Sequence, residues 1–269
     1  MMQELPALSY GQYSLVYNAF SFTIAAMGGA TIFFWLNRGA VAPAYRVALS
    51  ITGLVTAIAT YHYFRIYNNW GEAYTVVGDV ARPSGVHFND AYRYIDWLLT
   101  VPLLLVEIIL IMRLPADETR RRGWRLGMAA AVMVALGYPG EIATSVPVRA
   151  AWGTAATIPF LYIVWELFRG LGDAIERQPE DVRGLIRQAR IVTFASWGFY
   201  PIVYMVPFLG PQTAAAETVV QVGYTLADIV AKAGFGFLIF VIARRKSRRE
   251  PADQVEYLVD ETSDAAGPR

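Results

Sequence analysis

The chain has 269 residues, of which 55% are hydrophobic and only 17% are charged, and it contains no cysteine. Because soluble domains carry roughly 25% charged residues, this surplus of apolar side chains indicates a membrane protein whose main partner is the lipid bilayer. The formal net charge of +1 provides no basic field for a nucleic acid. The lack of cysteine excludes disulfides, thiolate metal sites and cysteine nucleophiles, and we predict no metal site.

Seven stretches are long and apolar enough to cross a bilayer as helices, which takes about 20 residues each. In chain order they are residues 12–36, 44–67, 91–112, 124–145, 150–169, 188–209 and 219–243. Together with their loops they use nearly the whole chain. We therefore expect an all-α membrane protein with one seven-transmembrane helix bundle over residues 1–249, followed by a flexible cytoplasmic tail over residues 250–269.

Basic residues cluster in alternate loops of this pattern, at 38–46, 113–125, 169–187 and 244–249, whereas the other loops carry little positive charge. Lysine and arginine near the ends of membrane spans are enriched on the cytoplasmic side. The N-terminus is therefore expected outside and the C-terminus inside. This arrangement predicts a multi-pass protein of the cell membrane, meaning the inner or plasma membrane.

The longest outside loop, between the second and third spans, contains AYTVVGDVARPSGVHF at residues 73–88. Its β-branched and aromatic residues are interrupted by glycine and proline, a pattern that is typical of short strands joined by turns. We predict a short antiparallel β-hairpin in this loop.

Ionisable residues inside membrane spans are costly, and each is a candidate functional residue. Asp228 and Lys232 lie four residues apart in the seventh span, so they share one helix face about 6 Å apart along the axis. Lys232 is near the middle of the span, too deep for its amine to reach water. It must be neutral, paired or covalently modified, and a Schiff base is one such modification. A purely structural pair with Asp228 is the alternative.

The third span carries Asp96 and Glu107, which are eleven residues apart and therefore share a face, about 16 Å apart along the axis. One carboxyl lies on each side of the depth of the lysine, the arrangement that directional proton transfer requires. Thr100 lies one turn inward from Asp96, and Arg93 lies just outward. His62 of the second span lies at the depth of Asp96 and can hydrogen-bond it. Alternatively, Glu107 is an interfacial carboxylate and His62 a buried histidine bonded elsewhere.

Aromatic residues lie in the middle of the spans rather than at the interfaces. Trp97 follows Asp96, and Trp197, Tyr200 and Tyr204 recur at helical spacing around Pro201 in the sixth span. A stripe of aromatic residues on a membrane helix more often packs in the protein core or forms a belt at the membrane interface. Its depth near Lys232 favours a pocket for a long, apolar, conjugated ligand.

Several motifs match one family. They are RYIDWLLTVPLLLVE (93–107), DIVAK (228–232), SWGFYP (196–201), YHYFRIYN (61–68) and GYPGEI (137–142). With seven spans and an outside N-terminus, the chain resembles the microbial (type 1) rhodopsins over about residues 10–243. It most resembles the proton pumps of the proteorhodopsin and xanthorhodopsin group.

The resemblance implies a light-driven outward proton pump and photoreceptor protein, which is an ion transporter and not an enzyme. All-trans retinal would be bound covalently to Lys232 as a protonated Schiff base. Asp96 would be the primary proton acceptor and a counterion, Asp228 the second counterion, and Glu107 the proton donor. Three side chains would complete the group around the acceptor: Arg93, His62 and Thr100.

Nine positions match the chromophore pocket of this family: Trp97, Leu104, Met133, Gly137, Phe160, Trp197, Tyr200, Pro201 and Tyr204. Gly153 matches the glycine that, in the xanthorhodopsin group, opens a window through which a carotenoid antenna approaches the retinal. Close helix packing explains a small residue equally well. The resemblance further implies a homo-oligomer, either a pentamer or a trimer.

Two other functions are open at this stage. A photosensory rhodopsin would cycle protons slowly and signal through a partner, although sensory members usually lack a carboxylate at the donor position. A retinal-free seven-helix transporter or receptor would use Lys232 and Asp228 as an ion-pair gate. We find no clear carboxylate pair for proton release at the outer end.

Overall fold

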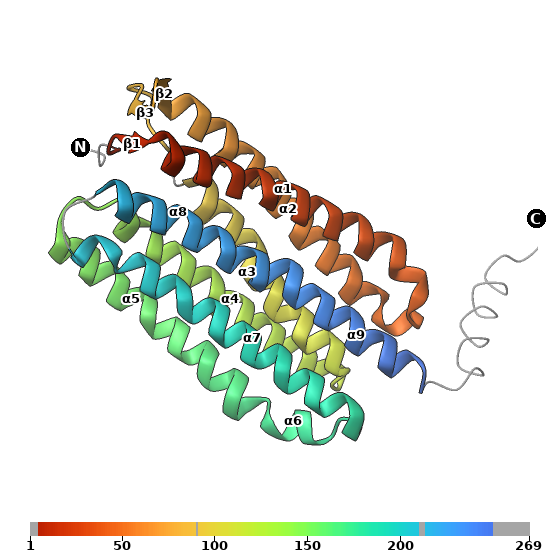
Figure 1. Ribbon diagram of the computed structural model, residues 1–269. Helices are drawn as coiled ribbons and strands as arrows, with labels where there is room; N and C mark the ends of the chain where they lie inside the picture. The colour runs from red at the N-terminus through yellow and green to blue at the C-terminus, as the bar shows by residue number, and fades with distance from the viewer. Residues whose placement is uncertain (1–4, 90, 210–212, 250–269) are drawn as a thin grey trace, which may run out of the picture.

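A computed structural model describes residues 5–89, 91–209 and 213–249. Long helices lie side by side in this part of the chain, and a small sheet lies at one end of the first two helices (Figure 1). The predicted tail at 250–269 lies outside the described residues.

Seven helical rods make up the bundle in the described residues, as predicted. They are α1 (Tyr10–Leu36), α2 (Pro43–Ala73), α3 (Ala91–Met112), α4 (Ala116–Glu141), α5 (Val146–Trp165), α7 (Glu180–Tyr204) and the continuous pair α8 (Ala214–Ile229) and α9 (Phe235–Ser247). Five short segments complete them: η1 (Asn37–Ala40), the π-helical η2 (Glu166–Gly170), α6 (Gly172–Glu176), η3 (Val206–Leu209) and the π-helical η4 (Val230–Gly234), which links α8 to α9.

Several helices extend further than their apolar stretches predict. Among the described residues, five stretches are apolar enough to cross a membrane by length and composition: Tyr10–Ala40, Pro43–Ala73, Ala91–Met112, Val146–Glu176 and Ala214–Ser247. The helices α4 and α7 are less apolar because each begins with acidic residues followed by arginines. Acidic residues in a first turn stabilise a helix N-terminus, so both helices begin about two turns before the apolar stretch does.

The predicted hairpin is present. Strands β2 (Tyr74–Val77) and β3 (Val80–Pro83) pair antiparallel, with Val77 opposite Val80. The intervening turn has Gly78 at φ +60°, a conformation that glycine adopts without strain. A further strand, β1 (Leu8–Ser9), pairs with β3 on its free edge. Two residues are too few for a periodic pattern, so this strand was not predictable.

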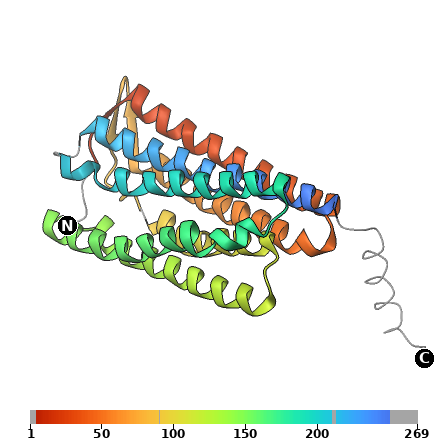
Figure 2. The same ribbon diagram turned by 90° about the horizontal axis from the view of Figure 1, so that it is seen from below.

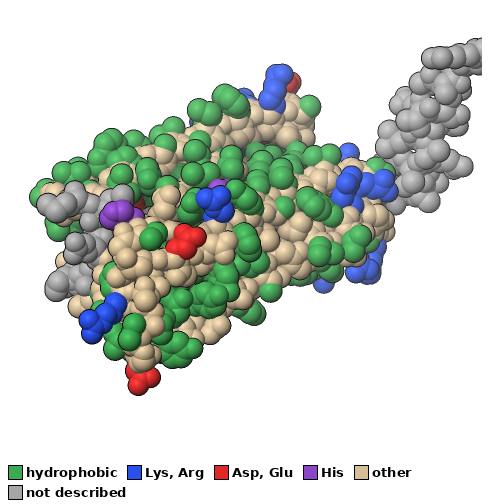
Figure 3. All heavy atoms as spheres, turned by 90° about the horizontal axis from the view of Figure 1, so that it is seen from above, with side chains coloured by type: hydrophobic (Ala, Val, Ile, Leu, Met, Phe, Trp, Pro, Cys, Tyr) green, Lys and Arg blue, Asp and Glu red, His purple; other side chains and the backbone are tan. Residues whose placement is uncertain are grey.

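The rods from α1 to α5 pack each against the next, and α8 packs against both α1 and α7. Figure 2 shows α4 and α5 together along the side of the bundle that lies away from α1. Large apolar side chains such as Phe22, Leu36 and Ile158 are exposed on the outside of the rods, and Figure 3 shows hydrophobic atoms spread over this surface. In a membrane these side chains face lipid, which accounts for the high apolar content.

Candidate functional site

Lys232 lies in the middle of the α8–α9 rod, inside the π-helical turn η4 (Val230–Gly234). Its side chain is only 1% exposed. A π turn inserts an extra residue into the helical ladder and is frequent at functional sites. The π turn was not predicted, because helical periodicity alone does not reveal a single-turn irregularity.

The amine of Lys232 is held between two carboxylates. Its Nζ lies 2.5 Å from Oδ1 of Asp228 on α8 and 2.9 Å from Oδ2 of Asp96 on α3. All three side chains are buried. The structure therefore contains the predicted pair of Lys232 with Asp228, but Asp96 also brings a second helix to the same cation. A pair confined to one helix does not describe this site.

Asp228 accepts three further hydrogen bonds. Tyr63 donates to Oδ2 at 2.7 Å, while Tyr200 and Trp97 donate to Oδ1 at 2.5 and 3.0 Å. Tyr63 is a site residue that the sequence reasoning missed, although it lies beside His62 in a quoted motif. A hydroxyl inside a span, near the depth of Asp96, could have suggested it. These donors fix the carboxylate in one position.

Arg93 and Thr100 occupy the same helix as Asp96. The guanidinium of Arg93 is buried, donates to Oε1 of Gln221 at 2.8 Å and lies over the ring of Tyr224 at 5.1 Å. The Thr100 hydroxyl donates to the backbone carbonyl of Asp96 at 2.8 Å. Arg93 thus provides a second buried cation near the two carboxylates.

His62 is buried on α2, as its position in the span predicts. Its Nδ1 has no hydrogen-bond partner among the described residues, and no hydrogen bond joins His62 to Asp96. The expected hydrogen bond between His62 and Asp96 is thus not formed in this structure, and a role of His62 beside the acceptor stays a prediction.

An apolar cavity of about 340 Å³ adjoins Lys232. This volume falls within the range of about 300–1,000 Å³ that is usual for small-molecule pockets. All nine predicted pocket positions line it, together with Lys232 and Gly153: Trp97, Leu104, Met133, Gly137, Phe160, Trp197, Tyr200, Pro201 and Tyr204. An apolar, aromatic cavity with one primary amine in its wall fits a long apolar ligand that carries an aldehyde.

Two glycines let aromatic rings approach the helices that line this cavity. A Cβ atom on Gly153 of α5 would lie 2.8 Å from Cε1 of Tyr204, and one on Gly137 of α4 would lie 3.3 Å from Cε1 of Tyr94. Tyr204 in turn donates to the carbonyl of Arg149 at 2.8 Å. Gly153 therefore both lines the cavity and permits close packing, which leaves both explanations of this residue open.

Glu107 lies deep in the inner half of α3. Its side chain is fully buried, and Oε2 accepts a hydrogen bond of 3.1 Å from the Thr52 hydroxyl of α2. An interfacial carboxylate would be exposed, so the alternative explanation of Glu107 is wrong for this structure. The helix α2, which carries Thr52, packs along α3 on this side.

The outer end contains two acidic groups that the sequence reasoning did not single out. Glu217 is buried in the first turn of α8 and accepts a 2.9 Å hydrogen bond from Gln221, the partner of Arg93. Burial and the nearby Glu217 raise the pKa of Tyr74 above its ordinary value. Glu141 lies 3.3 Å from Arg149 in a separate cluster. Both carboxyls lie near span ends, where acidic residues are common.

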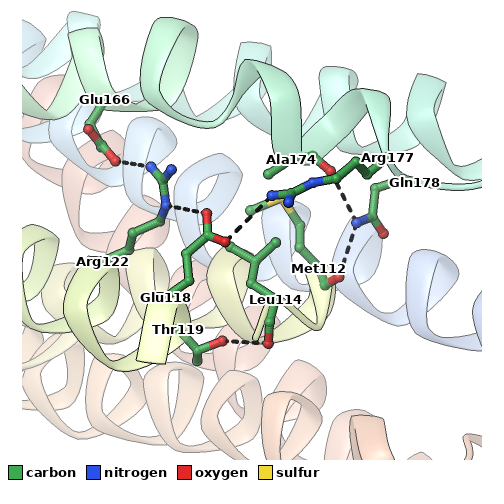
Figure 4. A network of polar contacts seen from close by, with 9 residues as sticks. All are labelled: Met112, Leu114, Glu118, Thr119, Arg122, Glu166, Ala174, Arg177 and Gln178. Atoms are coloured by element: carbon green, nitrogen blue, oxygen red, sulfur yellow. Dashed lines mark hydrogen bonds and ion pairs between the residues drawn. The ribbon is translucent and has the colours of Figure 1, made fainter. Parts of the chain in front are cut away.

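The inner end contains an ion-pair network, seen in Figure 4. Arg122 of α4 lies 2.9 Å from Glu118 and also pairs with Glu166 of η2. Arg177 reaches Glu118 at 3.5 Å. These contacts hold α4 against the irregular chain between α5 and α7, whose basic residues the sequence pattern places on the inner side.

The described residues thus define a seven-helix membrane protein in which a buried lysine, paired with two carboxylates, faces an apolar cavity. The chain belongs to the bacteriorhodopsin-like family, whose model matches residues 16–246. It is 31% identical over 232 residues to the green-light absorbing proteorhodopsin of a gamma-proteobacterium, covering 85% of this chain and 86% of that protein. It is likewise 31% identical over 222 residues to bacteriorhodopsin of Halobacterium salinarum, covering 80% and 79%.

Two solved structures are also similar to this chain. One is xanthorhodopsin, described as a light-driven ion pump with dual chromophore, with a TM-score of 0.88, 50% identity and coverage of 91% of this chain and 98% of that chain. The other is thermophilic rhodopsin, with a TM-score of 0.88, 47% identity and coverage of 90% and 98%. The predicted resemblance to the proteorhodopsin and xanthorhodopsin group is confirmed, as is a multi-pass protein of the cell membrane.

Proposed function

We propose that this protein is a light-driven outward proton pump that carries all-trans retinal on Lys232. One observation carries the proposal: the Nζ atom of Lys232 lies 2.9 Å from Asp96, while a second buried carboxyl, Glu107, lies further inward on the same helix. The pumping activity named for xanthorhodopsin supports the same conclusion.

The residues around the cavity fit retinal. Lys232 provides the amine that would hold it, and the aromatic rings of Trp97, Trp197 and Tyr200 would enclose its chain. When bound, retinal supplies the absorption of visible light and a change of shape upon isomerisation. The protein's own task is to hold a proton at Lys232 Nζ in the dark and to direct its departure after illumination.

Asp96, rather than Asp228, is the proton acceptor in this proposal. Oxygen atoms of Asp228 already accept hydrogen bonds from Tyr63, Tyr200 and Trp97 in addition to the amine. Oδ2 of Asp96 lies 2.9 Å from the amine without such additional donors among the described residues. A proton that leaves Lys232 Nζ can therefore bind Asp96 without displacing a tyrosine or a tryptophan. Asp228 stays in place as the second counterion.

Glu107 returns a proton to Lys232 Nζ from the inner side. Glu107 is buried in an apolar part of the bundle, where a neutral carboxyl costs less than a carboxylate, so it can keep its proton until the amine has lost one. The hydrogen bond with Thr52 fixes the position of the side chain. Because the acceptor lies outward and the donor inward of the amine, each cycle moves a proton from inside to outside. Outward transport also requires that Lys232 Nζ be open to the outer side when it loses its proton and to the inner side when it regains one.

Replacement of Glu107 by glutamine tests the donor. The amide has the same shape but cannot release a proton, so the return of the proton to Lys232 Nζ is expected to slow by about a hundredfold, as is usual when a positioned acid is lost. Flash photolysis measures this rate. Glu72→Gln, the same change at an exposed position of α2, serves as the control. An unchanged rate in Glu107→Gln would remove Glu107 from the proposed path.

The proposed pump itself is tested by illuminating cells that express the protein with retinal while external pH is recorded. We expect acidification of the medium that a protonophore abolishes. A photosensor would show colour without this acidification. A retinal-free transporter would stay colourless after the addition of retinal.

We further propose that the opening at Gly153 accepts a carotenoid antenna, as the dual chromophore named for xanthorhodopsin suggests. Gly153→Trp fills the opening and is expected to abolish excitation of the photocycle through the carotenoid, measured as an action spectrum. Gly29→Trp adds the same bulk at an exposed position of α1 with no atom within 4 Å of its Cβ, and it should keep the transfer. Equal transfer in both variants would contradict an antenna at Gly153.

A further inference from the structure

The inner end of α3 is closed by side chains from two other parts of the chain. The last carbonyls of a helix have no partner within the helix. Here Ile111 O accepts a hydrogen bond of 2.8 Å from Nζ of Lys246, and Met112 O accepts one of 3.0 Å from Nε2 of Gln178. Lys246 comes from the last turn of α9, and Gln178 from the turn between α6 and α7.

These two side chains also bond each other. Lys246 Nζ donates to Oε1 of Gln178 at 2.8 Å, and Gln178 Nε2 donates a second bond, of 3.2 Å, to Ala174 O. Figure 4 shows the amide of Gln178 between the carbonyls of Ala174 and Met112. Each of the two side chains is only 8% exposed, and the ammonium lies 5.5 Å from the ring centre of Tyr45 on α2. The cluster thus joins α2, α3, α9 and the α6–α7 turn.

Glu107 lies directly behind this cluster. It precedes Ile111 by one turn of α3, which is about 6 Å along the axis. On α2, the fully buried Leu49 lies between Tyr45 of the cluster and Thr52, the partner of Glu107. On α9, the fully buried Ile242 lies one turn before Lys246. The polar cluster and these buried apolar residues thus lie at the inner end of the bundle, on the side from which Glu107 would take up a proton.

We propose that Lys246 and Gln178 form a polar plug that closes the inner entrance to Glu107, and that opening of this plug limits proton uptake. The inference rests on the proposed function, because it takes Glu107 as the proton donor. Neither partner of the plug can pass a proton along. An ammonium has no free lone pair to accept one. The neutral amide of Gln178, whose oxygen accepts a hydrogen bond from the ammonium, is too weak a base to bind one. The hydrogen bonds must therefore break before water reaches Glu107.

The plug is tested with Gln178→Ala and Lys246→Ala, each measured with retinal in nanodiscs by flash photolysis with a pH-sensitive dye. Each variant removes hydrogen bonds that stabilise the closed form, one of them to a charged group, so proton uptake is expected to accelerate by about tenfold. Because both variants break the bond between Lys246 and Gln178, the acceleration in the double variant should be smaller than the product of the two single accelerations. In the variants the uptake rate should rise with proton concentration, whereas in the unchanged protein it should be independent of pH.

Amide hydrogen exchange in the dark provides a readout that does not depend on pumping. Loss of either side chain should speed exchange in the last turn of α3 relative to the outer half of that helix. Arg245→Ala is the control, since it removes an exposed cation one residue away on α9. If Lys246→Ala does not yield a coloured protein, Gln178→Ala carries the test alone because it leaves the cation in place.

The outcomes separate the plug from the pump. If illumination acidifies the medium but proton uptake in Gln178→Ala is unchanged or slower, the plug is overturned and the proposed function stays intact. The plug is also overturned if the rate of proton uptake by the unchanged protein depends on pH. If the unchanged protein shows no light-driven pH change, the proposed function fails, while faster exchange at the inner end of α3 would still establish the plug as a structural closure.

Discussion

Replacing Lys232 by alanine is expected to abolish both the colour of the protein after addition of retinal and any light-driven pH change. The chain has two lysines, and among the residues that line the cavity only Lys232 provides a primary amine. Alanine leaves the cavity larger and removes the one group that would hold an aldehyde covalently. Absorption in the visible range after addition of all-trans retinal measures the result.

A stability effect must be separated from this loss. Without Lys232, the buried carboxylates of Asp96 and Asp228 lose their shared cation, and breaking a buried ion pair in this way costs about 3–5 kcal/mol. Thermal unfolding of the unloaded variant therefore has to accompany the spectrum. Lys246→Arg removes the other primary amine but keeps the charge, and it should remain coloured. Colour in Lys232→Ala would place the attachment elsewhere and contradict the proposed site.

Helix spacing was sufficient to predict the centre of the site. The four-residue interval from Asp228 to Lys232 put two charges on one face at mid-depth, and the structure places them in contact. The eleven-residue interval from Asp96 to Glu107 put both carboxyls on one face of α3, and both are buried. Such predictions succeed because a membrane helix is regular and because charges within it must face the interior.

Contacts between helices were less predictable. Tyr63 as a partner of Asp228, and Gln178 as a partner of the α3 carbonyls, each join positions more than sixty residues apart. Nothing in a single sequence fixes the rotation of α2 against α8. The π turn at Lys232 depends on the packing of the whole rod. The missed partners are therefore those that tertiary packing chooses, whereas the predicted ones follow from a single helix.

Replacing Asp96 by asparagine is expected to abolish light-driven acidification while leaving the protein folded and coloured. Asparagine keeps the shape of the side chain but cannot bind the proton that leaves Lys232 Nζ. The amine retains Asp228 at 2.5 Å, so the variant does not leave a buried cation alone. Because this pair remains, Asp96→Asn tests proton transfer with little effect on folding. Asp228→Asn is a poorer test, since it also disturbs the three side chains that donate hydrogen bonds to Asp228.

External pH under illumination, with and without a protonophore, measures the effect of Asp96→Asn. Asp117→Asn, the same change at an exposed position near the start of α4, is the control and should acidify the medium as the unchanged protein does. Acidification that persists in Asp96→Asn at the unchanged rate would mean that the proton leaves the amine by another path. Asp228 would then be the remaining carboxylate within reach of Lys232 Nζ, and its bonds to Tyr63 and Tyr200 would have to break in each cycle. Loss of acidification with the colour retained identifies Asp96 as the group that receives the proton, because Asp228 and the cavity are unchanged in that variant.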